Sequence, residues 1–151
     1  MNIAIIRRCA VCLAAVAGAA CSSAVGGASA NGSVDSSIPA FNGCTPEMFV
    51  TGMSATTVSF GGQASSPLFG YAPKCVRITA GESVTFTGDF SVHPVSPGTS
   101  PTATTAGSAT SPIPLQQTGS SLSVTFPEAG TYPYFCQVHY AAGMSGVVLV
   151  Q

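Results

Sequence analysis

The chain has 151 residues, of which 46% are hydrophobic and only 6% are charged, with a formal net charge of −1. A nucleic-acid-binding protein neutralises phosphates with lysine and arginine, so this composition argues against that class. The 17 glycines and 11 prolines favour turns and strands over helices. We therefore expect a single all-β domain with enough apolar material for a core.

The first thirty residues are predicted to be an export signal. A short basic start, MNIAIIRR, precedes the apolar run CAVCLAAVAGAAC, which is too short for a membrane span. Two processing routes fit. Cleavage after Ala30 would release residues 31–151 as one domain, whereas cleavage before Cys21 would leave a lipidated cysteine as its membrane anchor. Both routes predict an exported protein, periplasmic or extracellular.

Alternation of apolar and polar residues predicts strands along the first half of the domain. Val58 and Phe60 alternate with polar neighbours in TTVSF, and KCVRITAGESVTFTG is typical of two strands around a turn at residues 80–83. The inward faces of these two strands would carry Val76, Ile78, Val84 and Phe86.

The next segment, residues 94–119, contains no charged or aromatic residue. Its Ser, Thr and Pro content predicts a long, low-complexity surface loop with little structure of its own. After it, SSLSVTF and GTYPYFC alternate again, and SGVVLVQ would be the closing strand. Some six to eight short strands predict a β-sandwich or a β-barrel.

A cysteine, a histidine and a methionine lie close together in YFCQVHYAAGM. The strand period of two places Cys136 on the inward face at the end of a strand, and His139 and Met144 follow in the loop before the last strand. The second of the chain's two histidines is His93, in DFSVHPV. Two imidazoles, one thiolate and a weak axial thioether are the ligands of an electron-transfer copper site.

A structural zinc site is the main alternative metal site. It would use Cys44, Cys75, Cys136 and one histidine, but the chain has no paired Cys-x2-Cys knuckle of the kind that zinc sites use. The copper interpretation is therefore favoured.

The arrangement Cys-x2-His-x4-Met before a terminal strand, with the flanking AGESVTF, PEAGTYPYFC and MSGVVLV, resembles the cupredoxins, specifically the plastocyanin and pseudoazurin branch. The resemblance covers about residues 71–151, and residues 31–70 contain no familiar motif. It implies a Greek-key β-sandwich. It also implies one type 1 copper ion cycling between Cu(I) and Cu(II), with the ligands His93, Cys136, His139 and Met144.

Two neighbours of these ligands depart from the family pattern. Pro94 stands where the family usually has a residue whose backbone N–H donates to the cysteine sulfur, and proline has no N–H. Val138 stands where the family often has proline, and it carries an N–H. Our hypothesis is that Val138 restores the missing hydrogen bond to Cys136 and so limits the fall in potential.

The remaining cysteines of the domain are Cys44 and Cys75. If Cys136 binds copper, these two are left to form a disulfide in an oxidising compartment, and two free thiols are the alternative.

The resemblance also implies an electron-transfer surface around His139, whose ring edge would lie in an exposed apolar patch with Tyr140. Phe135 either faces redox partners or is an outer-face aromatic covered by a loop. With so few charges, docking of redox partner proteins should depend weakly on salt. We expect a monomer.

These expectations favour a small exported blue copper protein that carries single electrons. The sequence contains no nucleophile–base pair or paired carboxylates that would indicate an enzyme. The alternative is a copper-binding protein for delivery, buffering or resistance, which would use the same four residues. A third option, a domain used only for adhesion or assembly, would leave those residues unused.

Overall fold

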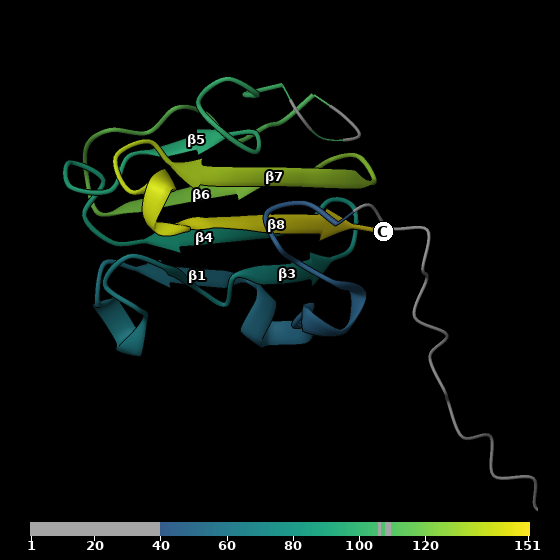
Figure 1. Cartoon of the computed structure of the whole chain (residues 1–151). Coiled ribbons are helices and arrows are strands. Elements are labelled where there is room, and N and C mark those ends of the chain that lie inside the picture. The colour runs from purple at the N-terminus through teal and green to yellow at the C-terminus, as the bar shows by residue number, and fades with distance from the viewer. Residues whose placement is uncertain (1–39, 106, 108–109) are drawn as a thin grey trace, which may run out of the picture. The chain divides into compact units, whose positions relative to one another are not determined.

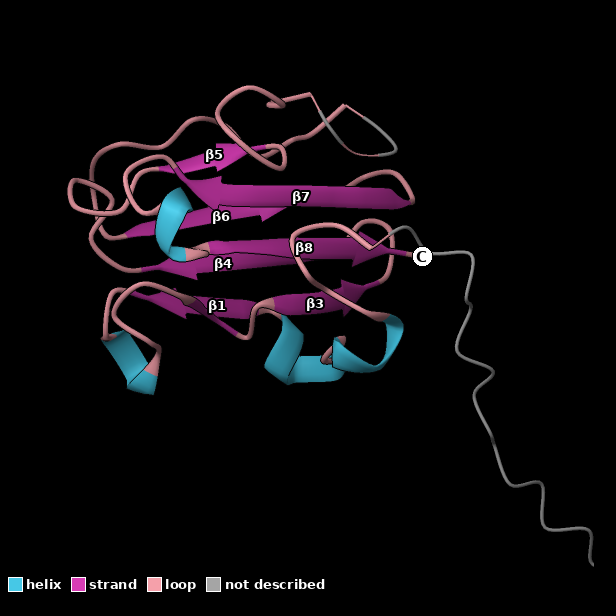
Figure 2. Cartoon of the chain, viewed as in Figure 1, coloured by secondary structure: helices cyan, strands magenta, loops and turns pink. Residues whose placement is uncertain are grey.

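The computed structural model describes residues 40–105, 107 and 110–151, so the predicted export signal and Cys21 lie outside the described residues. The described residues form eight strands in two four-stranded sheets, joined by loops and short 3-10 helices (Figures 1 and 2). Neither sheet follows the chain order, as in a Greek-key sandwich. The predicted all-β sandwich is confirmed. Within this part of the chain, no helix is long and apolar enough to span a membrane.

The first sheet has the order β2-β1-β4-β6. Its strands are β1 (Thr57–Phe60), β2 (Tyr71–Ala72), β4 (Ser83–Thr87) and β6 (Ser121–Thr125). β1 pairs antiparallel with β2 and parallel with β4, and β4 pairs antiparallel with β6. On β4 and β6 apolar side chains face the core, while hydroxyls pair on the other face, with Ser83 Oγ 2.7 Å from Thr125 Oγ1. This face is solvated.

The second sheet has the order β3-β8-β7-β5. Its strands are β3 (Cys75–Ile78), β5 (Val95–Pro97), β7 (Gly130–Cys136) and β8 (Ser145–Val150). β3 and β8 are parallel, and the other pairs are antiparallel. Every residue of β8 is buried, and so is every residue of β7 after Gly130. Both faces of β7 and β8 are therefore covered.

Residues 41–56 provide part of this cover. Phe41 and Phe49 pack against a buried cluster of Cys44, Cys75 and Val147. The Asn42 amide donates to the carbonyls of Tyr134 and Gly146, at 2.9 and 2.8 Å, and so binds β7 and β8 together. This stretch contains the 3-10 helices η1 (Pro46–Met48) and η2 (Gly52–Ala55). A disulfide joins Cys44 of this stretch to Cys75 of β3. Cys136 is a free cysteine.

The segment 94–119 is a loop over most of its described length, but parts of it are ordered against the sandwich. Val95–Pro97 forms β5, and Gln116 pairs with Val95 through two backbone hydrogen bonds of 2.9 and 3.0 Å. Ile113 is only 2% exposed and belongs to the main core. The sequence did not predict this order, because one apolar side chain within a polar stretch is enough to anchor a loop to the core.

Candidate metal centre

Cys136 is the last residue of β7 and lies at one end of the sandwich, with its side chain fully buried in the main core. Its register partner on β5 is Val95, two residues after His93. Its backbone N–H donates to the carbonyl of Met144 at 2.9 Å. The sheet pairing therefore brings the two segments that carry the candidate ligands to one strand end.

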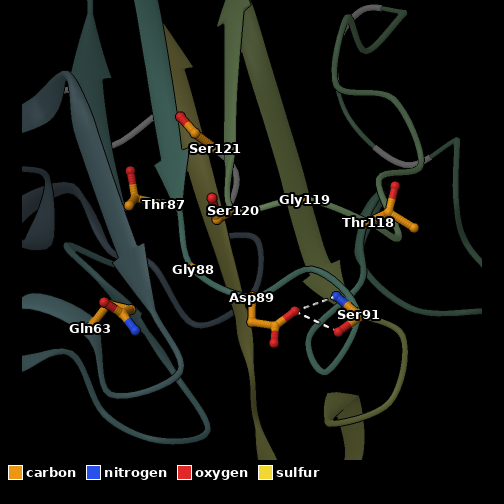
Figure 3. A pocket seen from close by; sticks show the side chains of 9 residues that line it. All are labelled: Gln63, Thr87, Gly88, Asp89, Ser91, Thr118, Gly119, Ser120 and Ser121. Atoms are coloured by element: carbon orange, nitrogen blue, oxygen red, sulfur yellow. Dashed lines mark hydrogen bonds between the residues drawn. The ribbon is translucent and has the colours of Figure 1, made fainter.

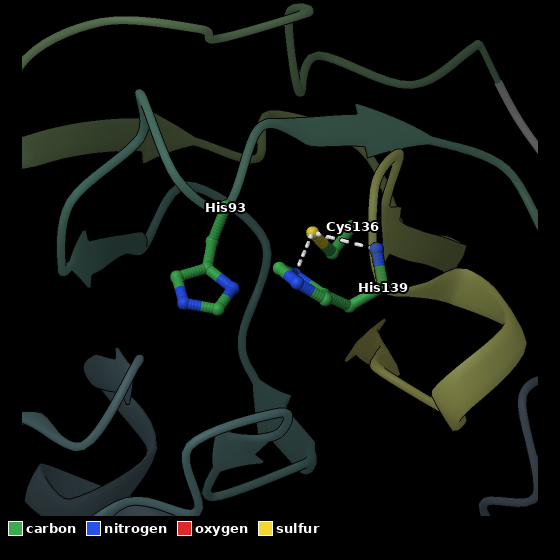
Figure 4. A group of neighbouring side chains, drawn as sticks. All are labelled: His93, Cys136 and His139. Carbon is green, nitrogen blue, oxygen red and sulfur yellow. Dashed lines mark hydrogen bonds between the residues drawn. The ribbon is translucent and has the colours of Figure 1, made fainter.

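His93, Cys136 and His139 form a compact group there (Figure 4), each offering a ligand atom within 4.8 Å of the others. Cys136 Sγ lies 3.6 Å from His139 Nδ1, and the two histidine rings have centroids 4.6 Å apart. The group joins two segments far apart in sequence. Of the described residues, it is the only set of three or more histidine, cysteine or carboxylate side chains positioned to hold a metal.

The chemistry of this group fits copper. His93 is 3% exposed, and its buried Nδ1 has no hydrogen-bond partner. Leaving a buried polar atom unpaired costs about 1–3 kcal/mol, and a metal ion would supply the missing partner. One soft thiolate with two imidazoles is a donor set that suits copper.

The turn between Cys136 and Met144 is closed by backbone hydrogen bonds. The carbonyl of His139 accepts the N–H groups of Ala142 and Met144, at 3.0 and 3.2 Å. These bonds enclose the 3-10 helix η4 (Tyr140–Ala142), which ends at Gly143 with a φ of 83°. Met144 is fully buried in the same core cluster as Cys136. The backbone thus fixes Met144 beside both residues that precede it in the motif.

Burial shifts the pKa values of Cys136 and His93 toward their neutral forms. Burial raises the pKa of the Cys136 thiol, and the backbone N–H groups of His139 and Val138 oppose this rise. Burial also lowers the pKa of His93, as does the neighbouring His139, while Asp89 acts in the opposite direction. Without a metal, Cys136 and His93 therefore avoid buried charge, and a metal cation would favour the thiolate.

The hydrogen bond to the sulfur comes mainly from a residue other than the predicted one. His139 N–H donates to Cys136 Sγ at 3.4 Å, whereas Val138 is the weaker of the two N–H groups that lower the thiol pKa. Pro94 is buried, and its carbonyl accepts the N–H of Gln137 at 3.0 Å. The hypothesis that Val138 compensates for Pro94 stays a prediction, and His139 N–H is a further donor to the sulfur that the sequence did not indicate.

Phe135 is one candidate for the electron-transfer surface, but its side chain is 0% exposed. Its ring packs edge-on against that of Tyr140, with centroids 5.7 Å apart. Because β7 is covered on both faces, a side chain that points away from the core is still buried. Phe135 is therefore a covered outer-face aromatic. The structure instead exposes Val138 and Tyr140, and it leaves His139 partly exposed.

Three residues that no sequence motif indicated lie against the histidines. Phe60 packs edge-on 6.1 Å from the ring of His93. At Gly61, an added Cβ would lie 2.9 Å from His93 Cδ2, so the backbone approaches that ring closely. Phe69 lies over the ring of His139, with centroids 4.7 Å apart. These residues lie far from the histidines in sequence. Only the strand alternation at Phe60 indicated a buried side chain.

A pocket of about 620 Å³ lies beside the loop that carries His93 (Figure 3). Asp89 accepts the N–H and the hydroxyl of Ser91 at its rim, at 2.9 and 2.6 Å. Its lining consists mainly of hydroxyl groups and glycines and includes none of the three grouped side chains. This pocket is therefore separate from the candidate metal centre.

A two-sheet sandwich with two histidines and a buried cysteine grouped at a strand end defines a copper-binding class of protein. The family model of copper binding proteins, plastocyanin/azurin family, matches residues 56–151. The chain belongs to this family, and its cofactor is copper. The resemblance to cupredoxins seen in the sequence is confirmed.

Plastocyanins are among the similar proteins. The chain is 36% identical over 107 residues to the chloroplastic plastocyanin of Physcomitrium patens, and the match covers 68% of this chain and 62% of that protein. The chain thus spans less than two thirds of this relative's length. It is 35% identical to the plastocyanin of Scenedesmus fuscus, covering 63% of this chain and 98% of that protein. Among solved structures, pseudoazurin from Methylobacterium extorquens AM1 is 24% identical with a TM-score of 0.45, over 63% of this chain and 73% of that one.

Proposed function

We propose that the protein carries single electrons between redox partners, with His93, Cys136, His139 and Met144 as the residues that would hold one copper ion. The observation that supports this most directly is the grouping of three ligand atoms within 4.8 Å of one another at a buried strand end. Bound copper would supply the one-electron Cu(I)/Cu(II) couple.

The chain's own residues favour fast electron exchange. Cys136 is held by a strand end, and the His139–Met144 turn is closed by backbone hydrogen bonds. Donors held this firmly move little when the charge at the site changes, so little rearrangement accompanies each transfer.

His139 is the proposed point of electron entry and exit. It is partly exposed, whereas His93, Cys136 and Met144 are 3%, 0% and 0% exposed. Val138 and Tyr140, beside His139 in the chain, are 62% and 40% exposed. We expect redox proteins to dock on this apolar patch, with a transfer rate that depends weakly on ionic strength because the domain has few charges.

The proposed location is outside the cytoplasm, periplasmic or extracellular. The Cys44–Cys75 disulfide supports it, because disulfides persist in oxidising compartments. Lipid attachment at Cys21 and the monomeric state remain predictions from the sequence.

Redox cycling tests this function. The copper-loaded domain would be reduced with ascorbate and reoxidised with ferricyanide through several cycles, in the presence of a Cu(I)-specific chelator. An electron carrier keeps its copper, so its visible absorbance returns in every cycle. Transfer of copper to the chelator on the first reduction would contradict the proposal and support the delivery role instead.

A further inference from the structure

Phe69 occupies an unusual position for a large apolar side chain. It is 49% exposed, yet its ring lies over the imidazole of His139, with centroids 4.7 Å apart and planes inclined by 32°. It also lies 6.3 Å from the ring of His93. A half-exposed phenylalanine in contact with a partly exposed histidine thus covers part of the surface through which electrons are proposed to pass.

The backbone around Phe69 is held in place. Tyr71, two residues later, is buried in the core and pairs with Phe60 in the β1–β2 ladder. Gly70 lies so close to Pro67 that an added Cβ would be 2.9 Å from the proline Cβ. The loop therefore turns tightly into β2, and this presents Phe69 to His139 from a fixed position.

We infer that Phe69 is a positioning residue for His139, and that it raises the reduction potential of the copper centre. This inference rests on the proposed function. The ring restricts rotation of the imidazole and excludes water from one of its faces. The oxidised centre carries one more positive charge than the reduced centre, and water stabilises the more highly charged state. Excluding water therefore favours the reduced state.

Leu68 provides a matched control. It precedes Phe69 in the same loop and is 60% exposed, and its side chain has no aromatic ring that could stack on His139. A general effect of removing exposed apolar surface at this loop would appear in Leu68→Ala as well as in Phe69→Ala. An effect that acts through His139 would appear only at Phe69.

The first test needs no metal. NMR of the metal-free protein reports the chemical shifts of the His139 ring protons, which a stacked aromatic ring displaces. We expect this displacement to disappear in Phe69→Leu, to persist in Phe69→Trp and to be unchanged in Leu68→Ala. Unchanged His139 shifts in Phe69→Leu would overturn the inference.

The second test is the midpoint potential of the copper-loaded variants. We expect a shift to lower potential in Phe69→Ala, a smaller one in Phe69→Leu, and a value close to wild type in Phe69→Trp and Leu68→Ala. An equal shift in Leu68→Ala, or none in a folded, copper-loaded Phe69→Ala, would overturn the role of Phe69. A wild type without reversible copper would overturn the proposed function, and the tuning role with it, whereas the NMR result on the contact would still hold.

Discussion

The loop that carries His93 and the turn that carries His139 place their histidines in contrasting surroundings. His93 is 3% exposed, its N–H donates to the carbonyl of Asp89 at 2.9 Å, and its ring lies against Gly61 and Phe60. His139 is partly exposed, donates its N–H to Cys136 Sγ at 3.4 Å, and lies under the half-exposed ring of Phe69.

This difference separates two tasks. The buried histidine is fixed on several sides and serves to hold the metal, whereas the partly exposed one also gives the centre its contact with the surface. Both sets of surroundings come from the segment between Thr57 and Ala72, which contains β1, η3 (Gln63–Ser65) and β2. The ligand motifs supply the donors, and this earlier segment covers the rings of the two histidines to different extents.

The largest change is expected from Gly61→Ala. Its Cβ would lie 2.9 Å from Cδ2 and 3.1 Å from Nε2 of His93, and its φ of +65° is strained for any residue with a Cβ. We expect His93 to be displaced and the intense copper band to be lost or much weakened. Visible spectroscopy of the copper-loaded variant is the measurement.

Gly62→Ala is the matched control for Gly61→Ala. Gly62 has a similar φ of +78° but nothing within 4 Å of an added Cβ. It should therefore show the backbone cost of about 1–2 kcal/mol with a normal copper spectrum. If both variants kept the same spectrum as wild type, the close contact between Gly61 and His93 would have no role in the centre.

A smaller change is expected from Val138→Pro, which removes the weaker of the two N–H groups near the sulfur. Because His139 still donates to Cys136 Sγ, we expect a small fall in midpoint potential, with Val138→Ala close to wild type. Spectroelectrochemistry measures both. An unchanged midpoint potential in Val138→Pro would show that the Val138 N–H does not affect the potential of the copper centre.

Phe135→Leu should leave the centre unchanged and affect only the fold. Phe135 is fully buried, so a conservative replacement should lower the free energy of unfolding by about 1 kcal/mol. The electron self-exchange rate, measured by NMR on a mixture of Cu(I) and Cu(II) protein, should stay at the wild-type value. If this rate fell strongly, electrons would have a second route besides His139.

Removal of the disulfide should leave the copper spectrum unaltered and still cost stability. Cys44 and Cys75 are separated by 31 positions in sequence and take no part in the grouped site. A double variant with Cys44→Ser and Cys75→Ser should lose about 3–4 kcal/mol in the chain-entropy model, measured by chemical denaturation. Loss of the blue colour in the folded double variant would link residues 41–56 to the metal centre.

The sequence predicts the fold best for strands that have one face exposed to solvent. On β4 and β6 the alternation of polar and apolar residues matches burial directly, and Val84 and Phe86, which were expected inside, are buried. On β7 the same rule gave the right direction for Phe135 but left open whether its side chain is exposed or covered, and the structure shows that it is covered. The cover on that face comes from other parts of the chain, and alternation carries no information about such cover.

The candidate ligands were predictable because three of them lie in one short motif and the chain has only two histidines. The roles of Gly61 and Phe69 were not. Glycine and a lone loop phenylalanine carry no periodic signal, and their contacts with His93 and His139 arise only when β1 and β2 join the first sheet. Ile113 illustrates the same limit within the long loop, where only its burial reveals its role.

The most direct test of the copper centre is to add Cu(II) to the metal-free domain and record its visible and EPR spectra beside those of Cys136→Ala. We expect an intense blue thiolate-to-copper band with narrow copper hyperfine splitting in the wild type and neither feature in the variant. A pale wild-type product, or a variant with the same spectrum, would contradict a type 1 site at His93, Cys136, His139 and Met144.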